Sequence, residues 1–137
     1  MKIRFNSRIA LFYPAGFEKT EELESLLRAH KIEMRIIDAS ALSYTAASLA
    51  GYIDSAEPTQ TYDDEENPNQ STLVFSGLTE QRLNNILDAL REAKLPIGLK
   101  AVLTGENRSW AFGALIKELL QEKAEVEKES KDDPAKE

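Results

Sequence analysis

The sequence predicts an α/β domain in which two βαβα repeats form a small, four-stranded, mostly parallel sheet flanked by helices. Two observations support this fold class. The apolar runs at residues 8–13 and 71–76 are continuous rather than alternating, which is typical of strands covered on both faces of a sheet. Each run precedes a helical pattern and a second strand-like run, the order of a right-handed βαβ unit. A ferredoxin-like α+β sandwich with an antiparallel sheet is the alternative, because hydrophobic periodicity does not separate the two folds.

The first half of the chain contains two strand patterns and two helical patterns. The run "RIALFY" at residues 8–13 ends at Pro14, and Thr20 is the expected cap of the following helix. In "EELESLLRAHKIE" the leucines recur at helical spacing, and two glutamates lie in the first turn, where the helix dipole favours carboxylates. A second strand is predicted at residues 33–40, followed by a short helix of small apolar residues that ends near Gly51.

Residues 54–70 interrupt the regular pattern. The stretch "DSAEPTQTYDDEENPNQ" contains six acidic residues and two prolines but no lysine or arginine. This composition predicts an exposed loop between the two halves. The carboxylate cluster at residues 63–66 lacks the alternating ligands and the glycine of a calcium loop, so we interpret it as a solvated run of charge and expect no metal site.

The second half repeats the order of strand, helix and strand. The strand at residues 71–76 leads to Thr79, the expected N-cap of a helix with an apolar stripe. Pro96 closes that helix because it lacks a backbone donor, and a further strand is predicted at residues 99–104.

The last helix is predicted to begin near Ser109 and to place its apolar face along residues 112–120. Beyond Glu122 the apolar stripe stops, and we expect the helix to fray into solvent. The chain is therefore divided into a single α/β domain at residues 1–122 and a charged, disordered tail at residues 123–137.

The two halves align with each other as pseudo-repeats at about residues 8–53 and 71–122. The alignment is clearest where residues 35–49 overlay residues 101–115. The matched pairs are Phe12 and Phe75, Ser43 and Ser109, Tyr44 and Trp110, and Leu49 and Leu115. An internal duplication is the hypothesis that this alignment suggests.

The composition excludes several classes of site. The chain has no cysteine, so disulfides, thiolate zinc sites and thiol nucleophiles are excluded. Its formal charge of −7 disfavours a sequence-independent grip on nucleic acid, which needs clustered cations. The single histidine, His30, lies near a predicted helix end, where an imidazole commonly contacts terminal carbonyls or stays solvated. No dinucleotide-binding glycine motif and no P-loop occurs, so we expect no cofactor.

Membrane association and export are not expected from the sequence. The apolar run at residues 9–13 is too short for the core of a signal peptide. No segment approaches the roughly 20 apolar residues that a membrane helix needs. We therefore expect a cytoplasmic protein.

The stretch "LKAVLTGENRSW" resembles the signature of a family of short bacterial domains of unknown function, LKAVLT-x-x-N-x-x-W. Here that signature comprises residues 99–104, Asn107 and Trp110. The resemblance covers about residues 73–122, and "SLAGYI" is similar to a glycine-containing element that precedes it in longer members. Members often have proline where this chain has Gly105. The resemblance implies the domain type and no activity, substrate or catalytic residue.

The turn between the strand at residues 99–104 and the last helix is the candidate site. Ligands of open parallel sheets lie at the carboxyl ends of strands, where helix N-termini direct backbone N–H groups at anions. Arg108 can form a bidentate contact with phosphate or carboxylate, and the repeat places Asp38 nearby or at a symmetry-related position. Such residues also build any strand-to-helix turn, so helix capping alone is the alternative interpretation. The candidate ligand-binding residues are Thr104, Gly105, Asn107, Arg108, Ser109, Trp110 and Asp38.

The sequence contains no credible acid/base pair and no activated nucleophile, so it predicts a non-enzymatic binding or regulatory module without catalytic residues. Its expected partner at residues 104–110 is a small anionic ligand or a protein. A homodimer is a further expectation, and no nucleic acid or membrane partner is expected. The alternative is a small enzyme acting on a phosphorylated or carboxylated metabolite, with Arg108 holding the anion and Asp38 as the base. A third interpretation is a protein-interaction domain whose surface lies on the helices.

Overall fold

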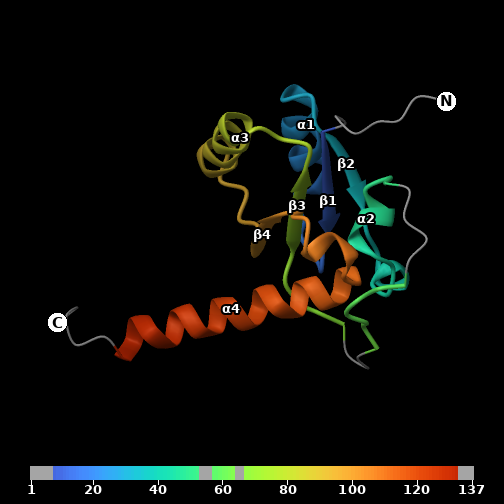
Figure 1. Ribbon diagram of the computed structural model, residues 1–137. Coiled ribbons are helices and arrows are strands. Elements are labelled where there is room, and N and C mark those ends of the chain that lie inside the picture. The colour runs from blue at the N-terminus through green and yellow to red at the C-terminus, as the bar shows by residue number, and fades with distance from the viewer. Residues whose placement is uncertain (1–7, 53–56, 64–66, 133–137) are drawn as a thin grey trace.

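The computed structural model describes residues 8–52, 57–63 and 67–132, with side chains up to residue 127 (Figure 1). None of the helices in these ranges is long and apolar enough to cross a membrane. In chain order, the elements are β1 (Ile9–Tyr13), α1 (Thr20–Ala29), β2 (Glu33–Ile36), the 3₁₀ helix η1 (Ala39–Ala41), α2 (Ala46–Leu49), β3 (Thr72–Ser76), α3 (Glu80–Glu92), β4 (Leu99–Val102), the 3₁₀ helix η2 (Asn107–Ser109) and α4 (Phe112–Asp132).

The four strands form one mixed sheet in the order β2-β1-β3-β4. β1 pairs with β2 in parallel and β3 pairs with β4 in parallel, while β1 and β3 are antiparallel. Two of the three pairings are therefore parallel, and the predicted α/β fold with two βαβ units is confirmed. The two units are joined through the antiparallel pair of β1 and β3. The edge strands β2 and β4 therefore run in opposite directions.

Helices cover both faces of the sheet (Figure 1). All five residues of β1 and all five of β3 are buried, as their continuous apolar runs predict. Side chains on one face pack against α1 and α3, and those on the other face pack against α2 and the start of α4. The largest fully buried side chains are Phe12, Phe75, Phe112, Leu11, Leu23, Leu27, Leu42, Leu73, Ile86, Leu115, Ile116 and Val74.

Positions that match in the sequence overlay meet at the centre of the molecule. In the antiparallel pair of β1 and β3, Leu11 lies opposite Val74, its match in the overlay. After β2 and β4 the chain crosses the same face of the sheet, and there Thr45 forms an antiparallel bridge with its match, Ala111. Two backbone hydrogen bonds of 3.0 and 2.8 Å flank this bridge, one donated by each half. The halves are thus related by an approximate two-fold axis, and their common origin stays a hypothesis.

The two expected helix caps differ in outcome. Thr79 is confirmed as the N-cap of α3, because its hydroxyl accepts a 3.2 Å hydrogen bond from the Arg82 N–H. The prediction for Thr20 is wrong, because this residue is already the first of α1. Its hydroxyl donates instead to the carbonyl of Phe17 at 3.3 Å. Phe17 ends a tight turn before the helix, in which its N–H donates to the Pro14 carbonyl.

The carboxyl end of α2 is fixed to the sheet by Arg35. Its guanidinium donates to the Leu49 carbonyl at 3.0 Å and to the Glu33 carboxylate at 2.7 Å. Gly51 follows with φ of +93°, and a Cβ there would lie 3.0 Å from the Arg35 Nη1. The backbone conformation requires glycine at this position, and a side chain there would also displace the end of the Arg35 side chain.

The helices α1 and α3 end in the same way, with a lysine in the left-handed region. The φ angles are 61° at Lys31 and 57° at Lys94. At the end of α3, the N–H of Leu95 donates to the Leu90 carbonyl and that of Lys94 to the Arg91 carbonyl, both at 3.1 Å. This is the hydrogen-bond pattern of a Schellman motif, which usually has glycine in the left-handed position.

Replacement of Lys94 by glycine is therefore expected to stabilise the protein by about 1 kcal/mol, because the left-handed backbone no longer carries a Cβ. Urea unfolding of Lys94→Gly measures the gain. Lys94→Ala is the control, because it removes the charge but keeps the Cβ, and it should bring no gain. An equal gain in both variants would assign the effect to charge and contradict the prediction.

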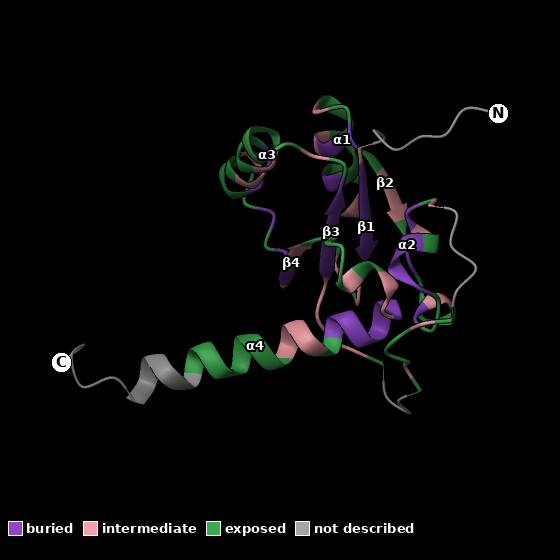
Figure 2. Ribbon diagram, in the orientation of Figure 1, coloured by how far each residue is buried: buried purple, intermediate pink, exposed green. Residues whose placement is uncertain are grey.

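The last helix extends further than the sequence predicts. Residues 112–116 at its start are buried, residues 118–120 are half-buried, and residues 121–127 are exposed where the helix projects from the domain (Figure 2). The tail expected to fray beyond Glu122 continues as helix to Asp132, and residues 133–137 lie outside the described part. The loss of the apolar stripe ends the packing, but the stretch "QEKAEVEKE" consists mostly of good helix formers, which keep the helix regular without packing.

Candidate functional site

The turn after β4 is closed by its own side chains. The Asn107 Oδ1 accepts from the Thr104 N–H at 2.8 Å, and the Thr104 Oγ1 accepts from the Asn107 N–H at 3.0 Å. The Asn107 Nδ2 also donates to the Val102 carbonyl at 3.2 Å. Thr104 and Asn107 therefore hold the backbone of the turn in one conformation, and their hydrogen-bonding groups are largely used within it.

Ser109 does not begin the last helix, contrary to the prediction. It ends η2, and its hydroxyl donates to the Glu106 carbonyl at 3.1 Å. Residues 110–111 are then extended, because Ala111 forms the bridge with Thr45. This pairing delays the start of α4 until Phe112.

Part of the acidic connection lies against this turn. The Thr59 N–H donates to the Ser109 carbonyl at 2.9 Å, and the Ala111 N–H donates to the Gln60 carbonyl at 2.8 Å. Trp110 is half-buried and packs against the core on the α4 side. Residues 53–56 and 64–66 of the connection, including most of the acidic cluster, lie outside the described residues. Within the described ones, no group of three or more potential metal ligands occurs.

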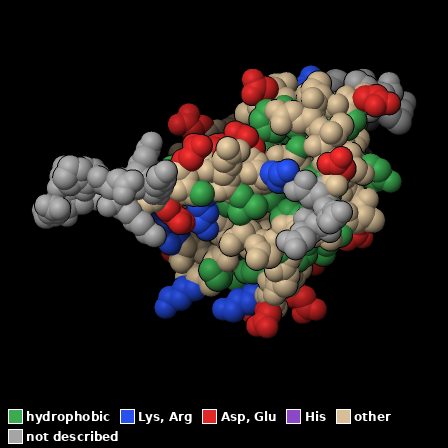
Figure 3. Space-filling model, turned by 90° about the horizontal axis from the view of Figure 1, so that it is seen from below, with side chains coloured by type: hydrophobic (Ala, Val, Ile, Leu, Met, Phe, Trp, Pro, Cys, Tyr) green, Lys and Arg blue, Asp and Glu red, His purple; other side chains and the backbone are tan. Residues whose placement is uncertain are grey.

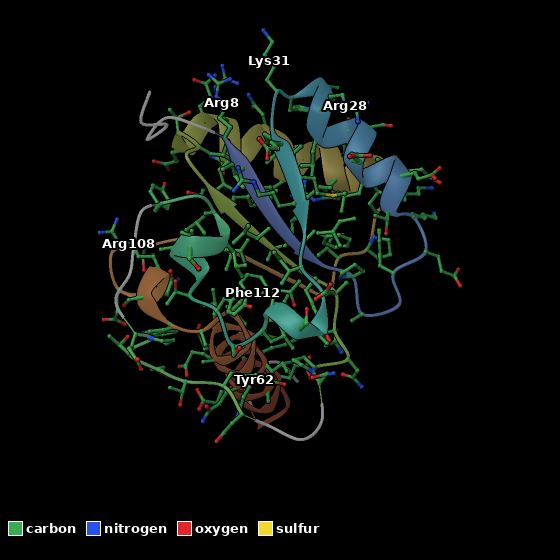
Figure 4. All side chains as sticks on the ribbon, turned by 90° about the vertical axis from the view of Figure 1, so that its right-hand side faces the viewer. Arg8, Arg28, Lys31, Tyr62, Arg108 and Phe112 are labelled. Atoms are coloured by element: carbon green, nitrogen blue, oxygen red, sulfur yellow. The ribbon has the colours of Figure 1, made fainter. Side chains whose placement is uncertain are left out.

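Arg108 is the candidate side chain that the turn leaves exposed. Figure 4 shows Arg108 at the periphery of the molecule, on the side opposite Arg28. It forms no ion pair with a carboxylate of the described residues. Gly105 is exposed as well, and a Cβ built there would meet nothing within 4 Å. The backbone at Gly105 is therefore open to solvent, and close packing does not require glycine there.

Asp38 caps η1 at the end of β2. Its Oδ1 accepts from the Ser40 hydroxyl and, at 3.0 Å, from the Ser40 N–H. These hydrogen bonds, the one from the hydroxyl first, lower the pKa of Asp38. A carboxylate with a lowered pKa is a weaker base. Because β2 and β4 run in opposite directions, Asp38 lies at the edge of the sheet opposite the turn at residues 104–110, in the symmetry-related place.

The fold and the turn define a small α/β protein in which a closed strand-to-helix turn presents a cation. The family model described as "Domain of unknown function (DUF3783)" matches residues 71–126, which span β3 to the exposed part of α4. The match supports the resemblance of the second half to a family of unknown function. No curated protein and no solved structure matches the chain.

Proposed function

We propose that this protein is a binding module in which Arg108 contacts a phosphate or carboxylate group. The observation that carries the proposal is the contrast within the turn at residues 104–110. Thr104 and Asn107 fix the backbone by bonding to each other, while Arg108 stays exposed and forms no ion pair with the described carboxylates. A guanidinium on a rigid turn loses less freedom on binding than one on a mobile loop.

The enzymatic alternative has less support. It needs Asp38 as a base beside the anion held by Arg108, whereas Asp38 lies at the other edge of the sheet and hydrogen bonds lower its pKa. The cytoplasmic location and the homodimer expected from the sequence remain predictions.

Replacement of Arg108 by alanine is expected to weaken anion binding about tenfold or more, because a hydrogen bond to a charged group contributes about 1.5–3 kcal/mol. The measurement is the thermal shift of the full chain with inorganic phosphate, with citrate and with an acidic peptide, because a ligand of the native state raises the melting point. The small anions and the peptide distinguish a metabolite from the acidic surface of a protein partner.

Arg91→Ala is the control variant, because Arg91 is an exposed arginine that pairs with Asp88 at 3.1 Å and lies in the last turn of α3. It should leave the shift unchanged. Equal shifts in Arg108→Ala and wild type would contradict the proposal. If peptide binding were instead lost on replacing exposed Val126 by aspartate, the binding surface would lie on the helices.

A further inference from the structure

A second candidate site lies in the layer of α1 and α3, away from the turn at residues 104–110. A cavity of about 230 Å³ opens between the end of α1 and the first turns of α3. These two ends meet because the antiparallel pairing of β1 and β3 also makes α1 and α3 antiparallel. The cavity is lined by Ala29, His30, Lys31, Ile32, Arg82 and Asn85.

The residues that line the cavity carry positive charge, although the whole chain has a formal charge of −7. It contains Lys31, Arg82 and His30 but no aspartate or glutamate. None of these three side chains forms an ion pair with a carboxylate of the described residues. Figure 4 shows Lys31 at the same end of the molecule as Arg8 and Arg28. The positive charge of this cavity is thus available to an external anion.

Two carboxylates of a neighbouring hollow are already paired. Glu24 and Glu33 line a neighbouring hollow that shares Lys31 with this one. Glu24 lies 3.6 Å from the Arg28 guanidinium, and Glu33 lies 2.7 Å from that of Arg35. These two carboxylates therefore pair with Arg28 and Arg35, which do not line the cavity.

Arg82 lies near the amino end of α3, in a turn that also contains the acidic residue Glu80. It is the third residue after the N-cap Thr79, and its backbone N–H donates a hydrogen bond to the Thr79 hydroxyl. The amino end of a helix carries partial positive charge and favours acidic side chains. A bound anion would therefore lower the electrostatic cost of the Arg82 cation further than the exposed Glu80 does.

The approximate two-fold axis supplies an internal comparison. β1 and β3 begin at Ile9 and Thr72, and α1 and α3 end at Ala29 and Glu92, so both pairs are offset by the same 63 residues (72 − 9 and 92 − 29). The same offset matches His30 to Ala93, Lys31 to Lys94, Arg82 to Lys19 and Asn85 to Glu22. The equivalent place in the other half thus has no imidazole and has a carboxylate where the cavity has an amide.

We propose that the cavity between α1 and α3 binds a phosphate group, either as inorganic phosphate or as part of a small phosphorylated metabolite. Arg82 donates to two oxygens of the phosphate, and Lys31 supplies a second positive charge. Asn85 and His30 add N–H donors at its rim. This site is independent of Arg108, and the proposal does not rest on the function proposed for the turn at residues 104–110.

His30 provides a direct measurement because it is the single histidine of the chain. The experiment follows its imidazole NMR signals in the full chain during titration with inorganic phosphate, glycerol 3-phosphate and glycerol at constant ionic strength, which keeps unspecific screening constant. We expect saturable shifts with both phosphates and none with glycerol. Tighter binding of glycerol 3-phosphate would identify a phosphorylated metabolite, and equal binding would identify the phosphate group alone.

Arg82→Gln is expected to raise the Kd for phosphate about tenfold or more, because it removes the bidentate cation. Lys19→Gln is the matched control, since it removes the same charge at the equivalent place of the other half and should change the Kd less than about twofold. Asn85→Glu introduces the carboxylate that the other half has at the equivalent position, Glu22, and should abolish phosphate binding. All three positions are exposed, so the variants should unfold at the wild-type temperature.

Three results would overturn the proposal. The first is the absence of saturable shifts at millimolar phosphate. The second is an equal loss of binding in Arg82→Gln and Lys19→Gln, which would indicate attraction by overall charge. The third is a loss of phosphate binding in Arg108→Ala but not in Arg82→Gln, which would place the phosphate at the turn at residues 104–110 instead.

Discussion

Replacement of Phe112 by alanine is expected to destabilise the protein by about 3–5 kcal/mol, the usual cost of truncating a buried phenylalanine. Phe112 is fully buried at the first position of α4 and packs in the core that also contains Leu115 and Ile116. Its N–H donates to the Tyr44 carbonyl at 2.8 Å, so its position is fixed by both halves of the chain. The free energy of urea unfolding measures the loss.

Val126→Ala on the same helix is the control for this prediction. Val126 is 62% exposed in the projecting part of α4, and its truncation should change the stability by less than about 0.5 kcal/mol. A loss below about 1 kcal/mol in Phe112→Ala would mean that the start of α4 is not part of the core. The contrast between the two variants tests whether the buried start of α4 stabilises the protein and its projecting part does not.

The parts of the fold that the sequence predicted are those with a local physical signal. The continuous apolar runs of β1 and β3 predicted strands covered on both faces, because a solvated face would require alternation. Thr79 was identifiable as a cap because its hydroxyl acts on the backbone three residues away. Neither inference depends on where the rest of the chain lies.

The direction in which the two βαβ units meet has no such signal. A buried strand has the same apolar pattern whether its neighbour is parallel or antiparallel, and residues 54–70 are long enough for either connection. The bridge between Thr45 and Ala111 depends on this direction. Because that bridge keeps Ala111 extended, the start of α4 at Phe112 instead of near Ser109 could not be predicted from the sequence. The proximity of His30 to Arg82 depends on it as well.

The candidate turn was located from its composition, but the role of each residue required the structure. Thr104 and Asn107 are ordinary turn residues in the sequence, and only their reciprocal hydrogen bonds show that they close the turn. Arg108 differs from them because its side chain stays outside this network. Asp38 could be matched to the turn by the repeat, but its distance from the turn follows from the antiparallel joining of the halves.

Replacement of Gly113 by alanine is expected to destabilise the protein by about 1–3 kcal/mol, the usual range for overpacking. In a helix this change normally stabilises by up to about 1 kcal/mol. Here a Cβ would overlap the ring of Tyr62, which lies on the connection between the two halves beside the start of α4 (Figure 4).

On the face of the molecule seen in Figure 3, hydrophobic side chains occur in small groups between polar ones.

A double-mutant cycle with Tyr62→Ala separates the two contributions. In the Tyr62→Ala background the added methyl meets no ring, so Gly113→Ala should become neutral or stabilising, with a coupling energy of about 1–3 kcal/mol. Equal losses in both backgrounds would show that the ring is not the obstacle. Because Tyr62 follows Thr59 and Gln60, which hydrogen-bond to residues 109–111, a positive coupling would also show that this segment is seated against the turn in solution. Any ligand of Arg108 would then bind beside an ordered segment rather than a free loop.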